Sequence, residues 1–408
     1  MIRHQVYFDT LGSMKEDSAS WRSVFAGLSV LRLVDTYADT ASPTNPAGWA
    51  QLHSVRTAIE EMAEGDAMGG VLTAVLKELT NRNAIDDTVR ISLLSYGRAL
   101  DYEANWGLAT DVFSTVAKLT RPEKNARLAV EANVLVGGAA RRNGEWDISA
   151  RAYSQAAYIA DTLSDRPGML TVQVGIANTY LAKGNFPQAQ SILDDVVVQA
   201  RDQDLPEIQG MALHSRSSLA QQKGEKAEAV QLAYRALGLT TRSSERDRII
   251  EDLAAGFSEL GLSEAARDAH LLLTATAQTK WVRWQATINL LELASLDGME
   301  DTFDTYAADL RKAPLGPWLK SYFLVFLGEG LERFGRYDAA RETLTEAVDY
   351  ATANLIHPAT FRAEAALVLL RSRSRTSTEA SVFGEVPQEV LAAAHAISEL
   401  RKATMASS

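Results

Sequence analysis

Histidine, cysteine and paired carboxylates are the residues of this sequence that could do chemistry near neutral pH. The sequence contains no cysteine, which removes disulfides, thiolate zinc sites and cysteine nucleophiles. No two of its histidines have the HExxH or HxH spacing of a metal site, so no metal is predicted. The histidines are His4, His53, His214, His270, His357 and His395.

Carboxylates lie close together on predicted helices, for example Glu60 with Glu61 and Glu329 with Glu332. General acid–base catalysis would need a shaped cleft that raises the pKa of one member, and the sequence indicates neither. No GxxxxGK[ST] phosphate-binding loop occurs in the sequence. We therefore predict no catalytic residue and no cofactor. An enzyme whose site is assembled from distant residues is a third hypothesis, which a deep pocket of converging titratable groups would support.

The elements that would position functional side chains are clearest between Leu327 and Val348. Small or apolar residues form one helical stripe before Gly335 and another after it. Gly335 can adopt the positive φ that ends a helix without the steric cost of a Cβ atom. The stripes are Leu327, Gly328 and Leu331, then Ala340, Leu344 and Ala347. The pattern predicts two antiparallel helices that approach closely and are joined by a short turn.

The same pattern recurs along the chain. Backwards from Gly335, the turn position is taken by Gly298, Gly261, Gly224, Gly184, Gly144, Ala104 and Gly65, in steps of 37, 37, 37, 40, 40, 40 and 39 residues. Prolines lie near the predicted ends of these units, at Pro122, Pro167, Pro206, Pro314 and Pro358. Over about residues 49–358 the chain resembles tetratricopeptide repeats, in a variant whose period exceeds the usual ~34 residues.

The resemblance implies an all-α fold, a right-handed superhelical solenoid of about eight antiparallel helix pairs with terminal capping helices. Residues 1–48 would form the N-terminal capping segment, 49–358 the repeat array, and 359–408 the C-terminal capping helices and tail. In such solenoids the first helix of each pair lines the concave wall, with inner-face positions thirteen, ten, six and three residues before the turn residue. The partner-binding residues implied there are Arg98, Arg141, Asn178, His214, Gln221, Arg248, Gln285 and Tyr322.

Polar and apolar residues alternate on this predicted inner face, which suits an extended peptide. Asn178 is the strongest candidate because one carboxamide can both donate to and accept from a peptide bond. For His214, a surface position is the simpler interpretation and a ligand contact is the alternative. Trp281 and Trp284 share a helical face and either pack on the neighbouring unit or anchor a partner. The carboxylate-clamp domains that bind chaperones have a Lys and an Asn four residues apart on one helix. Here Val174 stands four residues before Asn178, so this pair is absent.

Composition bears on the partners. A net charge of −11 and an isoelectric point near 5.2 argue against a nucleic-acid partner. No stretch reaches the roughly 18 apolar residues needed to span a bilayer. The N-terminal segment has no cationic stretch followed by an apolar run, so a cytoplasmic protein is predicted. Arg371, Arg373 and Arg375 form a basic run, either a solvated loop or a contact for an acidic partner.

These observations together favour a non-catalytic scaffold or adaptor that binds a protein or an extended peptide in its concave groove. The alternative is a regulatory sensor whose superhelix changes shape when a ligand or peptide binds. No nucleic-acid or membrane partner is expected, and homo-oligomer formation is left open.

Overall fold

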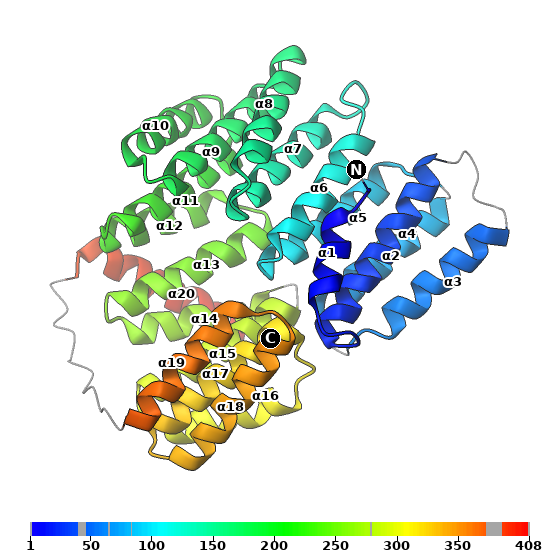
Figure 1. Ribbon diagram of the computed structural model, residues 1–408. Coiled ribbons are helices and arrows are strands. Elements are labelled where there is room, and N and C mark those ends of the chain that lie inside the picture. Colours follow the sequence, from blue (N-terminus) through cyan, green and yellow to red (C-terminus); the bar gives the residue numbers. More distant parts are fainter. Residues whose placement is uncertain are drawn as a thin grey trace. The chain divides into compact units, whose positions relative to one another are not determined.

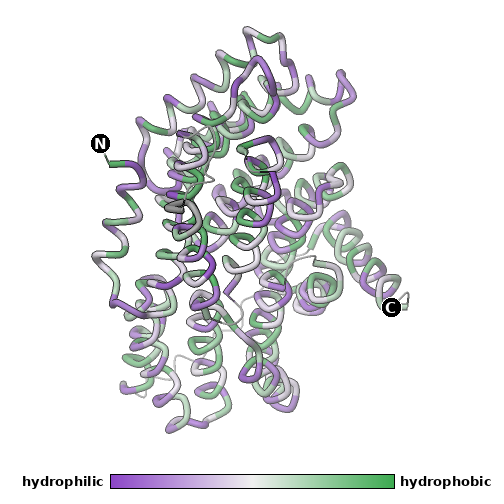
Figure 2. Tube along the Cα trace, turned by 90° about the vertical axis from the view of Figure 1, so that its right-hand side faces the viewer, coloured by the Kyte–Doolittle hydropathy of each residue, from purple (hydrophilic) through white to green (hydrophobic). Residues whose placement is uncertain are grey.

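The computed structural model of the chain describes residues 2–39, 46–63, 66–82, 84–277, 280–372 and 386–406. Within these ranges the chain forms twenty α-helices and no β-strand (Figure 1). The prediction of an all-α helical repeat fold is confirmed. None of the helices in these ranges is both long and apolar enough to cross a membrane. Hydrophilic and hydrophobic residues are interleaved along the helices (Figure 2), as expected when each helix buries one face.

The chain divides into two compact units, each of which is described by itself. Unit 1 comprises residues 1–182 with 353–355, and unit 2 comprises residues 183–352 with 356–408. The helices of unit 1 are α1 (Gln5–Ser13), α2 (Ala19–Asp39), α3 (Pro46–Glu60), α4 (Ala67–Arg82), α5 (Asp87–Tyr102), α6 (Trp106–Leu119), α7 (Ala126–Arg142), α8 (Trp146–Thr162) and α9 (Arg166–Ala182). Those that follow are α10 (Phe186–Asp202), α11 (Pro206–Gln222), α12 (Lys226–Leu239), α13 (Ser243–Glu259), α14 (Ser263–Thr276), α15 (Lys280–Leu296), α16 (Glu300–Lys312), α17 (Pro317–Arg333), α18 (Tyr337–Ala353), α19 (His357–Ser372) and α20 (Gln388–Ala406).

From α5 to α18, odd-numbered helices are the first helices of the predicted pairs and even-numbered helices are the second helices. The predicted turn residue lies between the two helices of each pair. All seven of these residues in the described ranges have positive φ: Ala104 (57°), Gly144 (77°), Gly184 (74°), Gly224 (80°), Gly261 (77°), Gly298 (70°) and Gly335 (75°). The predicted pairs and turns are therefore confirmed. Gly65 lies outside the described residues.

The backbone at Gly144 explains why a positive φ is needed there. The Gly144 N–H donates to the Arg141 carbonyl at 3.1 Å, and the next N–H donates back to the Ala140 carbonyl at 2.8 Å. These two bonds satisfy carbonyl groups that the end of α7 would otherwise leave without partners. Glycine adopts this conformation without a Cβ clash.

The turns between successive pairs were not predicted in this form. Ser164, Asp204 and Leu355 adopt φ values of 52°, 53° and 56° at the ends of α8, α10 and α18. Three of the five prolines named above lie in the first turn of the next helix, whereas Pro122 and Pro314 lie in the loops before α7 and α17. Pro167 is the second residue of α9, and Pro206 is the first residue of α11. A first helical turn tolerates proline because its N–H has no partner within the helix.

Small residues allow the helices of a pair to pack closely, as predicted for Gly328. A Cβ atom on Gly328 would lie 2.6 Å from Cγ of Leu344, so a larger residue would collide with α18. In unit 1 the Tyr153 ring of α8 is held in the same way by two glycines. A Cβ atom on Gly137 of α7 would lie 2.7 Å from this ring, and one on Gly175 of α9 would lie 2.3 Å from it. Tyr153 therefore packs against both first helices.

The helix lengths explain the long and variable period. The first helices α7, α9, α11, α13, α15 and α17 all have 17 residues. The second helices vary: α8, α10 and α18 have 17 residues, α12 and α14 have 14, and α16 has 13. A difference of three residues is close to one helical turn of 3.6 residues. After Gly144, the repeat steps of 40 residues therefore contain a longer second helix than the steps of 37 residues.

α19 ends the series of first helices. It packs against α17, and its polar residues lie where α17 has buried ones. Leu324 and Leu331 of α17 are 5% and 4% exposed, whereas Glu364 and Arg371, forty positions later, are exposed. Phe361, Val368 and Leu369 of α19 are exposed as well, at 67%, 62% and 50%, so the uncovered side of α19 is mixed in character. Arg373 and Arg375 of the predicted basic run lie outside the described residues.

The last helix does not lie beside α19 in the way that we expected of a C-terminal cap. α20 packs against α12 and α14 (Figure 1), and its Val390, Ala393 and Ile397 join the core of these helices. Arg401 Nε also lies 2.9 Å from Asp268 Oδ1 of α14. The apolar stripe of α20 is buried there rather than against α19. The division into residues 1–48, 49–358 and 359–408 stays a prediction.

Candidate functional site

Three of the predicted inner-face residues, Arg98, His214 and Gln221, have side chains that contact the next first helix. We call this inner face the ladder face, and each such contact a rung. In unit 1, Arg98 Nη2 of α5 donates to Glu131 Oε1 of α7 at 2.6 Å. Asp101 of α5 accepts from Arg142 Nε of α7 at 3.0 Å, and also from its Nη2. The Glu131 and Asp101 carboxylates are therefore both bound by arginines within unit 1.

Rungs occur at two registers, counted back from the turn residue of each pair. In the first, the residue six positions before the turn contacts the residue thirteen before the next turn, as in Arg98 with Glu131. In the second, the residue three before the turn contacts the residue two before the next turn, as in Asp101 with Arg142. Rungs of the second register in unit 2 are Gln221 Nε2 to Glu259 Oε2 at 2.7 Å and Arg333 Nη1 to Ser295 Oγ at 2.8 Å.

Between α7 and α9 both registers are empty. The first register has Gly138 on α7, which has no side chain to reach α9. The second has Arg141 on α7, but the position facing it on α9 is Ala182, which is exposed. Arg141 consequently has no ion-pair partner among the described residues. Three arginines (98, 141 and 142) face two carboxylates here, which leaves one positive charge unpaired.

Arg141 is partly withdrawn from water. Burial lowers the pKa of Arg141, and the neighbouring Tyr153 side chain partly offsets this effect. The Nε atom of Arg141 is buried and makes no hydrogen bond to the described residues. A guanidinium stays charged under these conditions because its pKa in water is far above neutral. The side chain is thus a cation with unused hydrogen-bonding capacity.

Asn178 lies on the same part of unit 1. The Tyr153 side chain interacts with Arg141 of α7 and with Thr179 of α9, so the last turns of these two helices come together. Asn178 directly precedes Thr179, is half-buried and makes no side-chain hydrogen bond to the described residues. Gly138 adds space here, because the nearest atoms to a Cβ built on it would be Arg142 Nη2 at 3.8 Å, the Tyr153 hydroxyl at 3.9 Å and Arg142 Nη1 at 4.0 Å.

The predicted residues of unit 2 are mostly engaged. His214 Nε2 of α11 lies 2.6 Å from Asp252 Oδ2 of α13, and Gln221 forms the rung described above. Arg248 is half-buried on α13, where it partly offsets the raised pKa of Glu251. Gln285 Nε2 donates to Asn289 on its own helix at 3.3 Å, while its Oε1 is buried without a partner.

Tyr322 belongs to an aromatic row on α17. Its ring centroid lies 5.0 Å from that of Trp318 and 6.0 Å from that of Phe326. Arg362 of α19 lies over the Phe326 ring, 4.3 Å from its centroid. The same guanidinium donates from Nε to Glu329 Oε1 at 2.8 Å and from Nη2 to Glu292 Oε1 at 2.6 Å. The contact with Glu329 is a rung of the first register with its charges reversed.

Some of these residues were missed by sequence reasoning. Arg142, Tyr153 and Arg362 were not singled out, although opposite charges 33 or 41 residues apart were a usable signal for two of them. Trp281 and Trp284 are partly buried against the core that α17 shares, in keeping with the packing alternative. No group of histidine and carboxylate side chains within the described ranges could hold a metal ion.

Comparisons with known proteins give one family and several structures. Residues 147–214, from α8 into α11, match the tetratricopeptide repeat family model. A search of curated proteins found no sequence match. Among solved structures, BtubC (BKLC) from P. vanneervenii is 13% identical, with 50% of this chain and 86% of that chain covered and a TM-score of 0.34.

Two further structures cover more of the chain. NprR in complex with its cognate peptide NprX is 14% identical, with 85% of this chain and 93% of that chain covered and a TM-score of 0.44. The Rap protein complexed with competence and sporulation factor is 12% identical, with 86% and 98% covered and a TM-score of 0.33. Because the helix pairs, their period and their turn residues follow the repeat pattern, and because the family model matches within them, the chain is a tetratricopeptide-like helical repeat protein.

Proposed function

We propose that the chain is a non-catalytic scaffold that binds a protein or an extended peptide on its ladder face. The observation that carries the proposal is the break in the ladder between α7 and α9. There Arg141 lacks the carboxylate that other ladder arginines have, and Asn178 has an unused carboxamide. In unit 1 this is where an incoming chain finds a guanidinium without an ion pair and a carboxamide without a side-chain hydrogen bond to the described residues.

The chemistry of the break favours an acidic extended peptide. A partly buried guanidinium without a counter-ion is unfavourable, and a carboxylate of the partner would supply the missing charge. Hydrogen bonds between charged groups contribute about 1.5–3 kcal/mol each. Asn178 can at the same time donate to and accept from one peptide bond of the partner, which fixes the direction of its backbone. The half-buried Gly138, which has no side chain, leaves room for the side chain that reaches Arg141.

The experiment uses the full chain and a displayed library of random extended peptides. Binders are selected with the wild type, and their dissociation constants are then measured for Arg141→Gln and Asn178→Ala. Each substitution is expected to weaken binding by about tenfold or more. Arg151→Gln is the matched control, because Arg151 is an exposed arginine on the second helix of the same pair. Binding that is unchanged in both variants, with helicity intact, would show that the break is not the binding site.

A second variant fills the break instead of removing its residues. Ala182→Glu places a carboxylate at the register position where Arg142 meets Asp101 one pair earlier. The new carboxylate should pair with Arg141 and weaken the binding of acidic peptides, while the free energy of unfolding is unchanged or higher. Ala182→Gln, which has the same shape without the charge, should bind nearly as the wild type does. Equal affinities for the two variants would contradict the role given to the charge of Arg141.

The second candidate function is a sensor, and the rungs are the observation that favours it. Rungs such as Arg98 with Glu131 and Glu329 with Arg362 link consecutive first helices through partly exposed side chains. A ligand that competes for these groups would alter the contact between neighbouring helices, and hence the pitch of the repeat. Small-angle scattering with and without a selected peptide tests this candidate. A radius of gyration that is unchanged at a saturating peptide concentration would exclude the sensor and favour the scaffold.

A further inference from the structure

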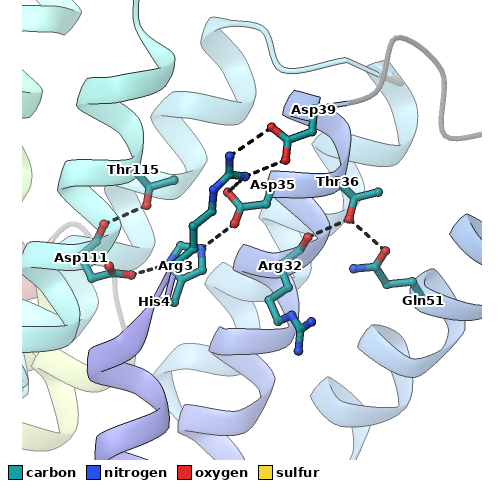
Figure 3. Close-up of polar contacts among 9 residues, drawn as sticks. All are labelled: Arg3, His4, Arg32, Asp35, Thr36, Asp39, Gln51, Asp111 and Thr115. Atoms are coloured by element: carbon teal, nitrogen blue, oxygen red, sulfur yellow. Dashed lines mark hydrogen bonds and ion pairs between the residues drawn. The ribbon is translucent and has the colours of Figure 1, made fainter. Parts of the chain in front are cut away.

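His4 is buried at the start of α1, far from the ladder residues in the sequence. Its backbone is left-handed, with φ of 59° and ψ of 34°, and its side chain is 4% exposed. Figure 3 shows the imidazole between two helices. Nδ1 lies 2.5 Å from Asp111 Oδ2 of α6, and Nε2 lies 3.2 Å from Asp35 Oδ2 of α2. One side chain thus joins the N-terminal segment to two other helices.

The two contacts require a charged imidazole. Ionised carboxylate oxygens only accept hydrogen bonds, so each ring nitrogen of His4 has to donate one. The imidazolium carries a hydrogen on both nitrogens, whereas a neutral tautomer carries it on one. In the neutral form one nitrogen lone pair would face a carboxylate oxygen, and that hydrogen bond would be replaced by repulsion.

The groups around His4 make the loss of its proton costly. Arg3 Nη1 lies 2.8 Å from Asp39 Oδ2 and 3.4 Å from Asp35 Oδ1 (Figure 3). Three carboxylates (Asp35, Asp39 and Asp111) therefore face two cations when His4 is protonated, a net charge of −1, and one cation when it is neutral, a net charge of −2. On its other side His4 meets the edge of Tyr7, at 6.4 Å between ring centroids.

α1 is held by this polar anchor and by one apolar side. The helix has nine residues, which is too short for a stable helix in water. It packs against α2 and α6, and its Tyr7 is fully buried and donates a hydrogen bond from its hydroxyl to that of Tyr96 at 3.1 Å. Val6 and Leu11 are only partly buried in the same core. Loss of the His4 contacts would remove the polar half of this attachment.

We propose that His4 is a proton-operated latch, which holds α1 against α2 and α6 when protonated and releases it when neutral. Release exposes the apolar side of α1 and the surface of α2 and α6 that it covers, including the region of Gly107, where a Cβ atom would lie 3.4 Å from Val6. The latch controls access to this surface and is separate from peptide binding on the ladder face.

The direction of the pH dependence follows from the environment of His4. Burial lowers the pKa of His4, but the hydrogen bond and charge of Asp111 and those of Asp35 outweigh burial, and the pKa is raised above 6.5. A group whose pKa is higher in the docked state stabilises that state fully below its free pKa. The stabilisation is lost as the pH rises through the raised value. α1 is therefore latched in mildly acidic solution and released in alkaline solution.

Hydrogen–deuterium exchange of the full chain tests the latch. The protection factor of the peptide that covers α1, corrected for the intrinsic rate at each pH, is measured at about pH 6 and about pH 9, on either side of the free histidine pKa. We expect it to fall about tenfold for each unit by which the pKa of His4 is raised. The protection factor of the peptide that covers α10 is measured at the same two pH values, and the fall at α1 should exceed any fall there.

Three variants make the result decisive. His4→Gln should give low protection of α1 at both pH values, and Asp111→Asn should shift the transition to lower pH while leaving it visible. His53→Gln, which replaces an exposed histidine of α3, should behave as the wild type does. The latch is overturned if the wild-type protection factor of α1 is the same at both pH values, or if His4→Gln keeps the wild-type pH dependence.

Discussion

At the scale of single residues, charged side chains on the ladder face are mainly bound to a residue one helix pair away. The partners are 33 residues apart for Arg98 with Glu131 and for Glu329 with Arg362, and 38 apart for Gln221 with Glu259. Each rung satisfies groups that would otherwise be desolvated between two packed helices. Truncation of one partner should therefore cost more than the pair contributes, because the other partner is left with its charge.

Arg362 offers the sharpest test of the rungs. Arg362→Met keeps much of the apolar stem but leaves Glu292, which is 25% exposed, without its arginine, and leaves Glu329, which is 13% exposed, with only the 3.5 Å contact to Arg333. We expect the free energy of unfolding to fall by about 1–3 kcal/mol, as measured by urea denaturation.

Arg341→Met is the matched control for this prediction. Arg341 and its partner Asp338 are 57% and 94% exposed, so the change should stay below about 0.5 kcal/mol. Equal losses in the two variants would mean that the rungs contribute no more than surface ion pairs.

At the scale of the elements, the turns decide where each helix pair begins and ends. Ala104 is the one confirmed turn residue with a Cβ atom, and its φ of 57° is unfavourable for any L-residue other than glycine, by about 1–2 kcal/mol. Ala104→Gly relieves this cost but adds freedom to the unfolded chain, so a net gain of about 0.5 kcal/mol is expected. Thermal unfolding of the variant measures it.

Gly144→Ala is the reciprocal substitution and should have the opposite sign. No atom lies within 4 Å of a Cβ built on Gly144, so the change acts through the backbone conformation alone. We expect a loss of about 1 kcal/mol in the free energy of unfolding. If Ala104→Gly destabilised the protein while Gly144→Ala did not, the positive φ at these turns could not be what determines the effect of the two substitutions on stability.

The turn register was predictable because glycine is the signal for it. The spacing of small residues around Gly335 was enough to place seven turns and the helix pairs that they join. The turns at Ser164, Asp204 and Leu355 carried no such signal, because these residues adopt positive φ only where the surrounding packing imposes it. The position of α20 was unpredictable for a related reason. An amphipathic stripe indicates that a helix is covered on one side and does not say by which partner.

The candidate site was predictable in part. The offset from each turn located the ladder face, and Arg141 and Asn178 were named from it. The pairing of their neighbours was missed, because it depends on which residue of the next helix stands opposite. Which residues of two neighbouring first helices stand opposite each other is known only once the lengths of the helices are known. Asp101 with Arg142 is an example. Gly138 could be recognised as a break in the ladder only after the contacts between the other first helices were known.

At the scale of the whole molecule, stability should vary with pH through titratable groups buried in the helices of unit 2. In unit 2, burial raises the pKa of Glu251 to about 7, and the charge of Asp252 adds to this effect, whereas Arg248 opposes it. The unfolded chain ionises this carboxyl near 4.5, so the folded state loses stability as the pH rises from about 4.5 to 7. Burial lowers the pKa of His270 to about 4, which removes stability as the pH falls below 6.5.

Glu251→Gln isolates the carboxyl contribution. The variant has no charge at this position, so its free energy of unfolding should decline less than that of the wild type between about pH 5 and about pH 7. Urea denaturation at the two pH values measures the difference. Glu264→Gln, at an exposed position of α14, should follow the wild-type curve. Parallel curves for wild type and Glu251→Gln would exclude Glu251 as a source of the pH dependence.

The constant length of the first helices, set against the variable length of the second helices, has a consequence for how such a chain can change. Six first helices keep 17 residues, and the rungs depend on that spacing. The second helices already differ by up to four residues without disturbing it. Insertions or deletions of a helical turn should therefore accumulate in the second helices, so that length variation changes the surface of the second helices while the ladder face keeps its spacing.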